Sequence, residues 1–280
     1  MRKCFLTLDL EEWYHLEYVK PYVNDIASQQ RFVPRVIPFL ERMARENIYM
    51  TVFVLGSVAE QSPDLVRQIS AMGHEIGCHG QNHDLVYQMS DEKFREETVK
   101  ARNTIADIVG IAIMGYRAPC FSMTNRKLDI LWDLGFVYDS SFIRFRQHKL
   151  YNVMDMSSFE KIESLIYRSG NNYEFEIPTI NMMRMSIPIS GGGYFRLFPL
   201  WLTKLLMRKY WQSESNFVFY VHPFELCGVK LEHSGRMGIV NHFRFQVGRS
   251  TFQEKFDKYL DFLRSNGVRF MRFADYVNKG

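Results

Sequence analysis

A polar-flanked helical stretch that ends in glycine and is followed at once by a short β-rich run recurs along the chain. In the first such unit, Ser62-Pro63-Asp64 is predicted to open a helix. A serine N-cap, a proline in the first turn and an acidic residue near the helix dipole all favour a helix start. The helix is predicted to stop at Gly73, because glycine tolerates the left-handed conformation of a C-terminal cap. The β-rich run HEIGCH follows.

Three further units have the same order and precede the β-rich runs IAIMGY, FVYDSS and VRFMRF. Their helices are bounded by Ser90 and Gly110, by Thr124 and Gly135, and by Thr251 and Gly267. Thr251 and Glu254 have the spacing of a capping box, which supports the start of the last helix. The chain is therefore predicted to alternate helices with strands.

Strands that alternate with helices pair in parallel through right-handed crossovers. The runs KCFLTLDL, YMTVFVL, YEFEIPTI and FVFYVH add enough units to close a barrel. We therefore predict an α/β fold of the TIM-like (β/α) barrel type, with an open doubly wound sheet as the alternative. No glycine-rich phosphate loop follows the first strand, which counts against a nucleotide-binding version of that alternative.

The 280 residues are expected to form a single domain, residues 1–280, because barrels of this length are common and no linker or repeat divides the chain. Hydrophobic residues make up 46% of the chain, enough for a large core. Two stretches, 143–172 and 223–250, are predicted to be long irregular loops. Such loops in a compact domain are usually lids or binding loops.

The charge and cysteine content of the chain argue against two classes of protein, nucleic-acid-binding proteins and disulfide-rich proteins. The net charge is +4 and the basic residues are interleaved with acidic ones, so nucleic-acid binding is not expected. The four cysteines are far apart and contain no CxxC pair, which argues against a disulfide framework. The chain shows neither a signal peptide nor a transmembrane run, so a cytoplasmic location is predicted.

Chemically useful side chains gather at the ends of the predicted strands. In parallel barrels the site is built at the carboxyl ends of the strands. The polar residues at those ends are Asp9, Glu11, His79, His83 just beyond, Arg117, Asp139 and His222. Their common position predicts a site at the barrel mouth.

The segment TLDLEE ends the first predicted strand. Strand side chains alternate between faces, so Thr7, Asp9 and Glu11 share one face and the leucines share the other. If the leucines pack outward, two carboxylates converge inside the mouth, and like charges at close range need a cation or a shared proton. The alternative is a polar strand end with a solvated Glu11.

His79 and His83 have an H-x-x-x-H spacing. That spacing places both imidazoles on the same side of one helical turn, within reach of one ion. Two histidines and one carboxylate leave coordination positions open for water, as a catalytic site requires. The alternative is a pair of loop histidines satisfied by backbone groups.

Two later residues could complete such a site. Arg117, in GYRAPCF, could orient a carboxylate through two hydrogen bonds, although an ordinary ion pair is the alternative. His222, in FYVHPFE, ends a β run that Pro223 stops, and the alternative is a hydrogen-bonded rim residue.

The joint order of motifs is more specific than any one of them. From Thr7 to about Pro223 the chain carries TLDLE, CHGQNH, YRAP, LGFVYDSS, SGGGYFR and VHP. This order resembles the polysaccharide deacetylases of carbohydrate esterase family four. The resemblance implies a distorted, seven-stranded (β/α) barrel. It also implies a metal-dependent hydrolase that removes N-acetyl groups from a sugar or polysaccharide precursor.

The resemblance also implies roles for individual residues. The metal ligands would be Glu11, His79 and His83, with zinc as the expected ion. The catalytic residues would be Asp9 as base, His222 as acid, Arg117 as the brace of Asp9, and Asp139 as a supporting partner. The first motif departs from the family, because Leu10 separates Asp9 from Glu11 where two adjacent aspartates are usual.

Three aromatic residues are candidates for substrate binding. Tyr194 of the SGGGYFR segment could stack on a sugar, although a flexible glycine-rich loop is the alternative. Tyr220 replaces the leucine that the family has two places before the late histidine. Trp13 could form a cleft wall or pack within a loop.

The segment LFPLWLTKLLMRKYW is predicted to be a core helix rather than a membrane-surface helix.

Three functions stay open at this point. The first is the deacetylase acting on an N-acetylated sugar or oligosaccharide. The second keeps the metal site but hydrolyses a small cyclic amide or ureide, which would need a closed pocket rather than an open groove. The third is a non-catalytic carbohydrate-binding protein. The oligomeric state is not predicted.

Overall fold

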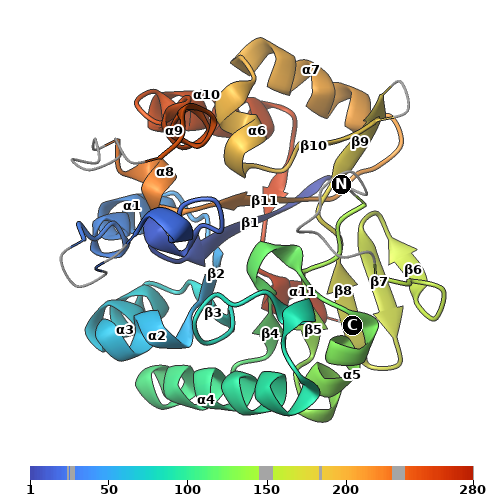
Figure 1. Ribbon diagram of the computed structural model, residues 1–280. Coiled ribbons are helices and arrows are strands. Elements are labelled where there is room, and N and C mark those ends of the chain that lie inside the picture. Colours follow the sequence, from blue (N-terminus) through green and yellow to red (C-terminus); the bar gives the residue numbers. More distant parts are fainter. Residues whose placement is uncertain (24, 26–28, 145–153, 183–184, 229–236, 280) are drawn as a thin grey trace.

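A computed structural model describes residues 1–23, 25, 29–144, 154–182, 185–228 and 237–279 (Figure 1). Its centre is a mostly parallel sheet with strand order β11-β1-β2-β3-β4-β5-β8-β7-β6, and β12 pairs with β1. Within the described residues, the run from β11 to β8 consists of seven strands, each parallel to its neighbour. The predicted α/β fold with parallel strands is confirmed.

The strands have the following bounds: β1 Lys3–Leu10, β2 Thr51–Val54, β3 Glu75–Cys78, β4 Gly115–Tyr116, β5 Tyr138–Asp139, β6 Glu160–Glu163, β7 Ile166–Ser169, β8 Asn172–Phe175, β9 Thr179–Met182, β10 Met185–Pro188, β11 Phe217–Val221 and β12 Arg269–Phe270. The β-rich runs of the sequence correspond to these strands. β4 and β5 are shorter than their runs IAIMGY and FVYDSS.

The ring of strands is incomplete between β8 and β11, where the antiparallel β9–β10 hairpin lies. Two backbone hydrogen bonds bridge part of this gap. Ile189 N donates to Pro178 O at 3.3 Å, and Tyr220 N donates to Ser190 O at 2.8 Å. The described strands therefore form a distorted barrel without a continuous closing ladder.

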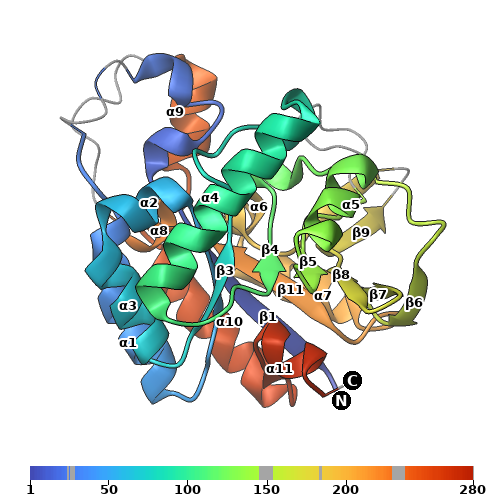
Figure 2. The ribbon, with the colours of Figure 1, turned by 90° about the horizontal axis from the view of Figure 1, so that it is seen from below.

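Helices cover the outside of the sheet, and Figure 2 shows α4 running across β3 and β4. Their bounds are α1 Ile37–Arg45, α2 Gly56–Gln61, α3 Pro63–Ala71, α4 Asp91–Val109, α5 Asn125–Asp133, α6 Gly192–Leu197, α7 Leu200–Tyr210, α8 Pro223–Leu226, α9 Ile239–Gln246, α10 Phe252–Ser265 and α11 Phe273–Val277. In the described part of the chain, no helix combines the length and the apolar character that a membrane crossing needs.

Local signals account for most helix ends. The hydroxyl of Ser90 accepts a hydrogen bond from Lys93 N at the start of α4, and Gly110 ends that helix at φ 72°. The capping box predicted at Thr251 does not form, because the Thr251 side chain makes no capping bond. The last helix starts where it was predicted, but without that support.

Two stretches expected to be irregular contain regular elements. Residues 143–172 include β6 and β7, and residues 223–250 include α8 and α9. The strand β6 lies at the sheet edge and is largely exposed. It therefore lacks the alternation of hydrophobic and polar residues from which a strand is predicted. Residues 145–153 and 229–236 of these stretches lie outside the described residues.

The two faces of β1 have different surroundings, as predicted. Leu6, Leu8 and Leu10 belong to the large core cluster beneath the helices. Phe5, on the opposite face, packs with other aromatic side chains inside the barrel. The alternation continues to the end of the strand and carries Asp9 to the mouth of the interior.

Candidate active site

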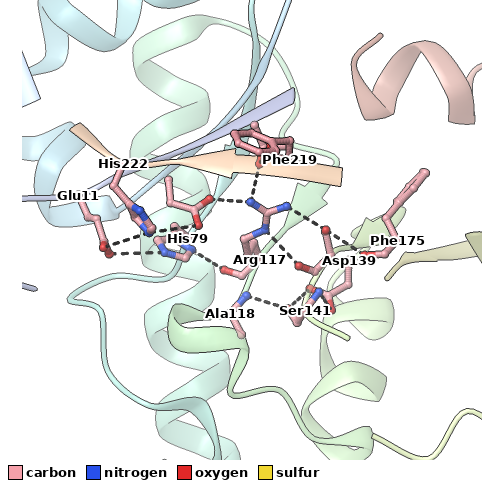
Figure 3. A network of polar contacts seen from close by, with 12 residues as sticks. Glu11, His79, Arg117, Ala118, Asp139, Ser141, Phe175, Phe219 and His222 are labelled. Carbon is pink, nitrogen blue, oxygen red and sulfur yellow. Dashed lines mark hydrogen bonds and ion pairs between the residues drawn. The ribbon is translucent and has the colours of Figure 1, made fainter. Parts of the chain in front are cut away.

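Three side chains predicted to share a metal converge at the mouth of the barrel. Oε2 of Glu11 lies 2.6 Å from Nε2 of His83 and 3.7 Å from Nε2 of His79. One possible ligand atom from each residue lies within 4.8 Å of the other two, and all three side chains are buried. Figure 3 shows Glu11 and His79 facing each other beside His222.

The two histidines meet through an irregular turn, which corrects the prediction of a helical turn. Residues 79–85 contain no helix; Gly80 has φ +81° and His83 has φ 61°. Gly56 N, at the start of α2, donates to Gly80 O and holds this turn. Nδ1 of His79 lies 2.7 Å from Arg117 O, so its N–H donates there and its Nε2 is left to face Glu11.

Arg117 braces Asp9 from inside the protein. Its guanidinium is fully buried and donates to Asp9 Oδ1 at 2.8 Å and to Thr7 Oγ1 at 2.7 Å. On its other side it donates to the carbonyl and hydroxyl oxygens of Ser140, and it lies over the ring of Phe53. The planar group is therefore fixed on several sides, which fixes the carboxylate of Asp9 as well.

His222 approaches the same centre from β11. Its Nε2 lies 3.9 Å from Glu11 Oε1 and 4.0 Å from Asp9 Oδ2, and its Nδ1 lies 3.1 Å from Glu225 Oε2. Glu225 is buried and accepts a hydrogen bond from Arg196 Nε at 2.8 Å. His222 is thus held by a carboxylate on one nitrogen and presents the other nitrogen to the site.

Opposite charges offset the cost of burial here. Burial by itself would raise the pKa of Glu11, but the neighbouring His83 and His79 bring it well below its usual value. Burial would lower the pKa of His83, but Glu11 raises it to about 9. Burial would also lower the pKa of His222, and Glu225 turns this into a net rise. The centre therefore favours an ionised carboxylate and positive charge beside it.

A cavity of about 360 Å³ opens over these residues. Asp9, Glu11, His79, His83 and His222 line its inner end. Of the aromatic residues predicted to bind substrate, Tyr194 and Tyr220 line the cavity. A volume of this order suits a small ligand or one end of a larger one.

Trp13 does not line this cavity. Its ring is buried beside Tyr14 and Phe245, and its Nε1 donates to Gln30 O at 2.9 Å. The assignment of Trp13 to substrate binding was therefore wrong. The indole packs within the segment that follows β1.

Asp139 lies away from the cavity as well. It pairs in register with Tyr116 on β4 and with Glu174 on β8, and Tyr116 belongs to the cluster beneath the helices. Its carboxylate accepts hydrogen bonds from the backbone and hydroxyl of Ser141, whose hydroxyl in turn accepts from Ala118 N. Asp139 supports the loops next to the site, as Figure 3 shows, and does not reach the reacting centre.

Two family models match different parts of the chain. Residues 23–138 match the family model described as polysaccharide deacetylase, and residues 140–278 match a domain of unknown function, DUF3473. A peptidoglycan-N-acetylglucosamine deacetylase from Bacillus cereus is 28% identical over 104 residues, which is 37% of each chain. The aligned part is therefore little more than a third of that relative.

The part of the chain from residue 23 to residue 138 is thus similar to polysaccharide deacetylases. Two solved structures share the fold of this protein. A Mycobacterium smegmatis protein described as a polysaccharide deacetylase has a TM-score of 0.59, with 18% identity over 99% of this chain and 90% of its own. Puue allantoinase has a TM-score of 0.61, with 15% identity over 99% and 89%. At these identities the likeness shows the fold alone.

The segments matched by the two family models contribute strands to one sheet. The first supplies β2 to β4, while β11 with His222 lies in the second and pairs with β1. The site therefore needs both matched segments. The residues of the metal-ligand pattern and the late histidine come together only because β11 lies next to β1.

Several residues around the candidate site were not predicted. Glu225 and Arg196 support His222 from behind, and Glu17 and Cys120 line the cavity beside His83. Only Glu225 could have been found from the sequence. In HPFE it lies three residues after His222, which is the spacing between an N-cap residue and the N3 residue of a capping box. The other three are brought in by long-range packing.

Proposed function

We propose that this protein is a divalent-metal-dependent hydrolase that removes an acetyl group from the nitrogen of an N-acetylated sugar, with zinc as the ion. The observation that carries the proposal is the meeting of Glu11, His79 and His83 beside Asp9 and His222 in one cavity. Two imidazoles and a carboxylate are the protein ligands of many catalytic zinc sites. The similarity of residues 23–138 to polysaccharide deacetylases supports an acetylated glycan as substrate.

The donor set fits a cation. Oε2 of Glu11 is buried, and although it lies 2.6 Å from His83 Nε2, it has no partner with hydrogen-bond geometry among the described residues. A buried carboxylate oxygen without a hydrogen bond is costly unless a positive charge stands beside it. When bound by Glu11, His79 and His83, a divalent ion would supply a Lewis acid that lowers the pKa of water and polarises a carbonyl.

Asp9 is assigned as the base. Its Oδ1 accepts a hydrogen bond from Arg117, which leaves Oδ2 to take the proton from a water that attacks the acetyl carbonyl. The hydrogen bond from Arg117 holds the Asp9 carboxylate in place. Arg117 also fixes the direction in which Oδ2 points.

His222 is assigned as the acid. Its Nε2 faces Asp9 and Glu11, and Glu225 holds its Nδ1 and favours the protonated ring. An amide nitrogen is a poor leaving group unless it is protonated as the bond breaks. A proton held at Nε2 of His222 can be donated to the departing sugar nitrogen.

Metal analysis combined with acetate release tests this proposal. Wild type should release acetate from some member of a panel of N-acetylated sugars and oligosaccharides, and a chelator should abolish that release. His79→Ala should lose both metal and activity, whereas His222→Ala should keep the metal and lose turnover by about 10²- to 10⁴-fold, the usual contribution of acid–base catalysis.

His242→Ala, outside the proposed ligand set, is the matched control and should keep the wild-type metal content. Equal metal content in wild type and His79→Ala would refute the ligand assignment. Metal binding without hydrolysis of any N-acetylated sugar would leave a carbohydrate-binding protein or an amidohydrolase of another substrate class. In that case the deacetylase assignment is wrong.

A further inference from the structure

A second group of possible metal ligands lies in the wall of the same cavity. One ligand atom each from Glu17, His83 and Cys120 lies within 4.8 Å of the other two. All three residues line the cavity, so that a fourth coordination position would face its interior. The group shares His83 with the proposed catalytic centre but uses neither Glu11 nor His79.

The outer nitrogen of His83 faces Glu17 without forming a hydrogen bond to it. His83 is 3% exposed, and its Nδ1 makes no hydrogen bond within the described residues. Oε1 of Glu17 lies 3.7 Å from that nitrogen, which is too long for a hydrogen bond. A buried ring nitrogen without a hydrogen bond is costly, and here a carboxylate and a thiol lie close to it. This atom points to a ligand on its outer side.

Two different segments bring the other groups to this nitrogen. Cys120 lies in the short 3-10 turn Pro119–Phe121 with φ 51°, between β4 and α5. Glu17 follows the 3-10 turn Trp13–His15 and is paired with Lys20 at 2.5 Å. Lys20 also donates to His83 O, so an ammonium group already stands beside the carboxylate. An ion here would share the Glu17 carboxylate with Lys20 or displace it.

We propose that Glu17, His83 and Cys120 form a second site for a thiophilic divalent cation such as Zn²⁺, Cd²⁺ or Co²⁺. A thiolate, an imidazole nitrogen and a carboxylate are all ligands that Zn²⁺ accepts in tetrahedral sites. Binding replaces the Cys120 S–H bond by a sulfur–metal bond and releases the proton to solvent, without any change of oxidation state.

The proposed catalytic metal site and the second site both use the imidazole ring of His83, so they compete for it. A neutral imidazole has one nitrogen with a free lone pair and one that carries a proton. If His83 binds an ion through Nδ1, its Nε2 carries the proton and is no longer a ligand for the centre at Glu11. Occupation of the second site should therefore weaken the first, so that excess thiophilic metal inhibits the enzyme.

Cobalt titration tests the second site without any measurement of activity. A thiolate bound to Co²⁺ gives a charge-transfer absorption in the near ultraviolet, and wild type should show this band as Co²⁺ is added. Cys120→Ser should lose the band, and Cys227→Ser, which alters a buried cysteine outside the cavity lining, should keep it. Glu17→Gln should weaken Co²⁺ binding at this site by about tenfold or more, since even residues that only support a ligand contribute 10- to 100-fold.

His79→Ala separates this proposal from the proposed deacetylase. That variant lacks a ligand of the first centre but keeps all three of the second, so it should retain the thiolate band even though it is inactive. Absence of the band in wild type, or its persistence in Cys120→Ser, would overturn the second site. Loss of the band in His79→Ala would show that the thiol binds the ion of the first centre, which also overturns it.

Discussion

Glu225→Gln tests how His222 is kept protonated. The substitution keeps the size of the side chain and an oxygen for Arg196, but removes the negative charge that lies 3.1 Å from Nδ1 of His222. Burial lowers the pKa of His222, and Glu225 is the first of the groups that raise it above its ordinary value. Without that charge the pKa should fall.

The size of the effect follows from the distance. Two unit charges 3.1 Å apart interact by about 5 kcal/mol at an effective dielectric constant of about 20. Hydrogen bonding to the neutral amide and solvent would recover part of this, so a fall of about 1 to 3 pKa units is expected, the usual range for an opposite charge at this separation. The protonated ring would then be scarce at neutral pH.

The assay is the pH dependence of kcat for acetate release. Because His222 acts in its protonated form, activity should be lost as the pH rises through its pKa, and this basic limb should move to lower pH by about 1 to 3 units in Glu225→Gln. At a pH below the new limb, much of the activity should return. A variant with lower kcat at every pH and an unmoved basic limb would show that Glu225 only supports the fold, and the reasoning would fail.

Two further substitutions address the stability of the site. Arg117→Met should lower the free energy of unfolding by about 3 to 5 kcal/mol in urea titrations, because it leaves Asp9 buried without its partner, and a loss below about 1 kcal/mol would contradict the bracing role. Burial raises the pKa of Asp139 from 3.8 to about 6, so the folded protein binds its proton more tightly than the unfolded chain. This contribution is present below about pH 4 and is lost as the pH rises through about 6. Asp139→Asn should therefore become more stable relative to wild type across this range in thermal melts, and parallel pH curves for the two proteins would refute the assignment.

The fold was predictable where the determining interactions are local. The cap at Ser90 and the left-handed glycine at Gly110 set the ends of α4 within a few residues of sequence, and both were found as expected. The hairpin of β6 and β7 was missed because its edge strand β6 is mostly exposed and does not alternate. The incomplete closure between β8 and β11 depends on how distant segments pack, which no local pattern records.

The same distinction explains the site. Asp9 was predicted because alternation along β1 carries it to the interior face, and Glu11 follows directly after this strand. The same rule, applied to β5, explains why Asp139 lies behind the site and not in the cavity. Tyr138 belongs to the aromatic cluster inside the barrel, so Asp139, next in the strand, must face the helices. A position at a strand end is therefore not enough.

Strand alternation could not predict the residues that surround the proposed ligands and catalytic groups. Glu225 becomes a partner of His222 only because α8 begins directly at the end of β11 and turns its first residues back over the ring. Cys120 reaches His83 because the turn after β4 adopts a left-handed conformation. This conformation is uncommon for residues other than glycine, so the sequence does not predict it. The proposed metal ligands and catalytic residues could be predicted from their positions at strand ends. The residues that influence the charge of these groups, or compete for them, are brought in by contacts between separate loops and could not be predicted. Variants of Glu225, Glu17 and Cys120 therefore probe the part of the chemistry that the motifs leave open.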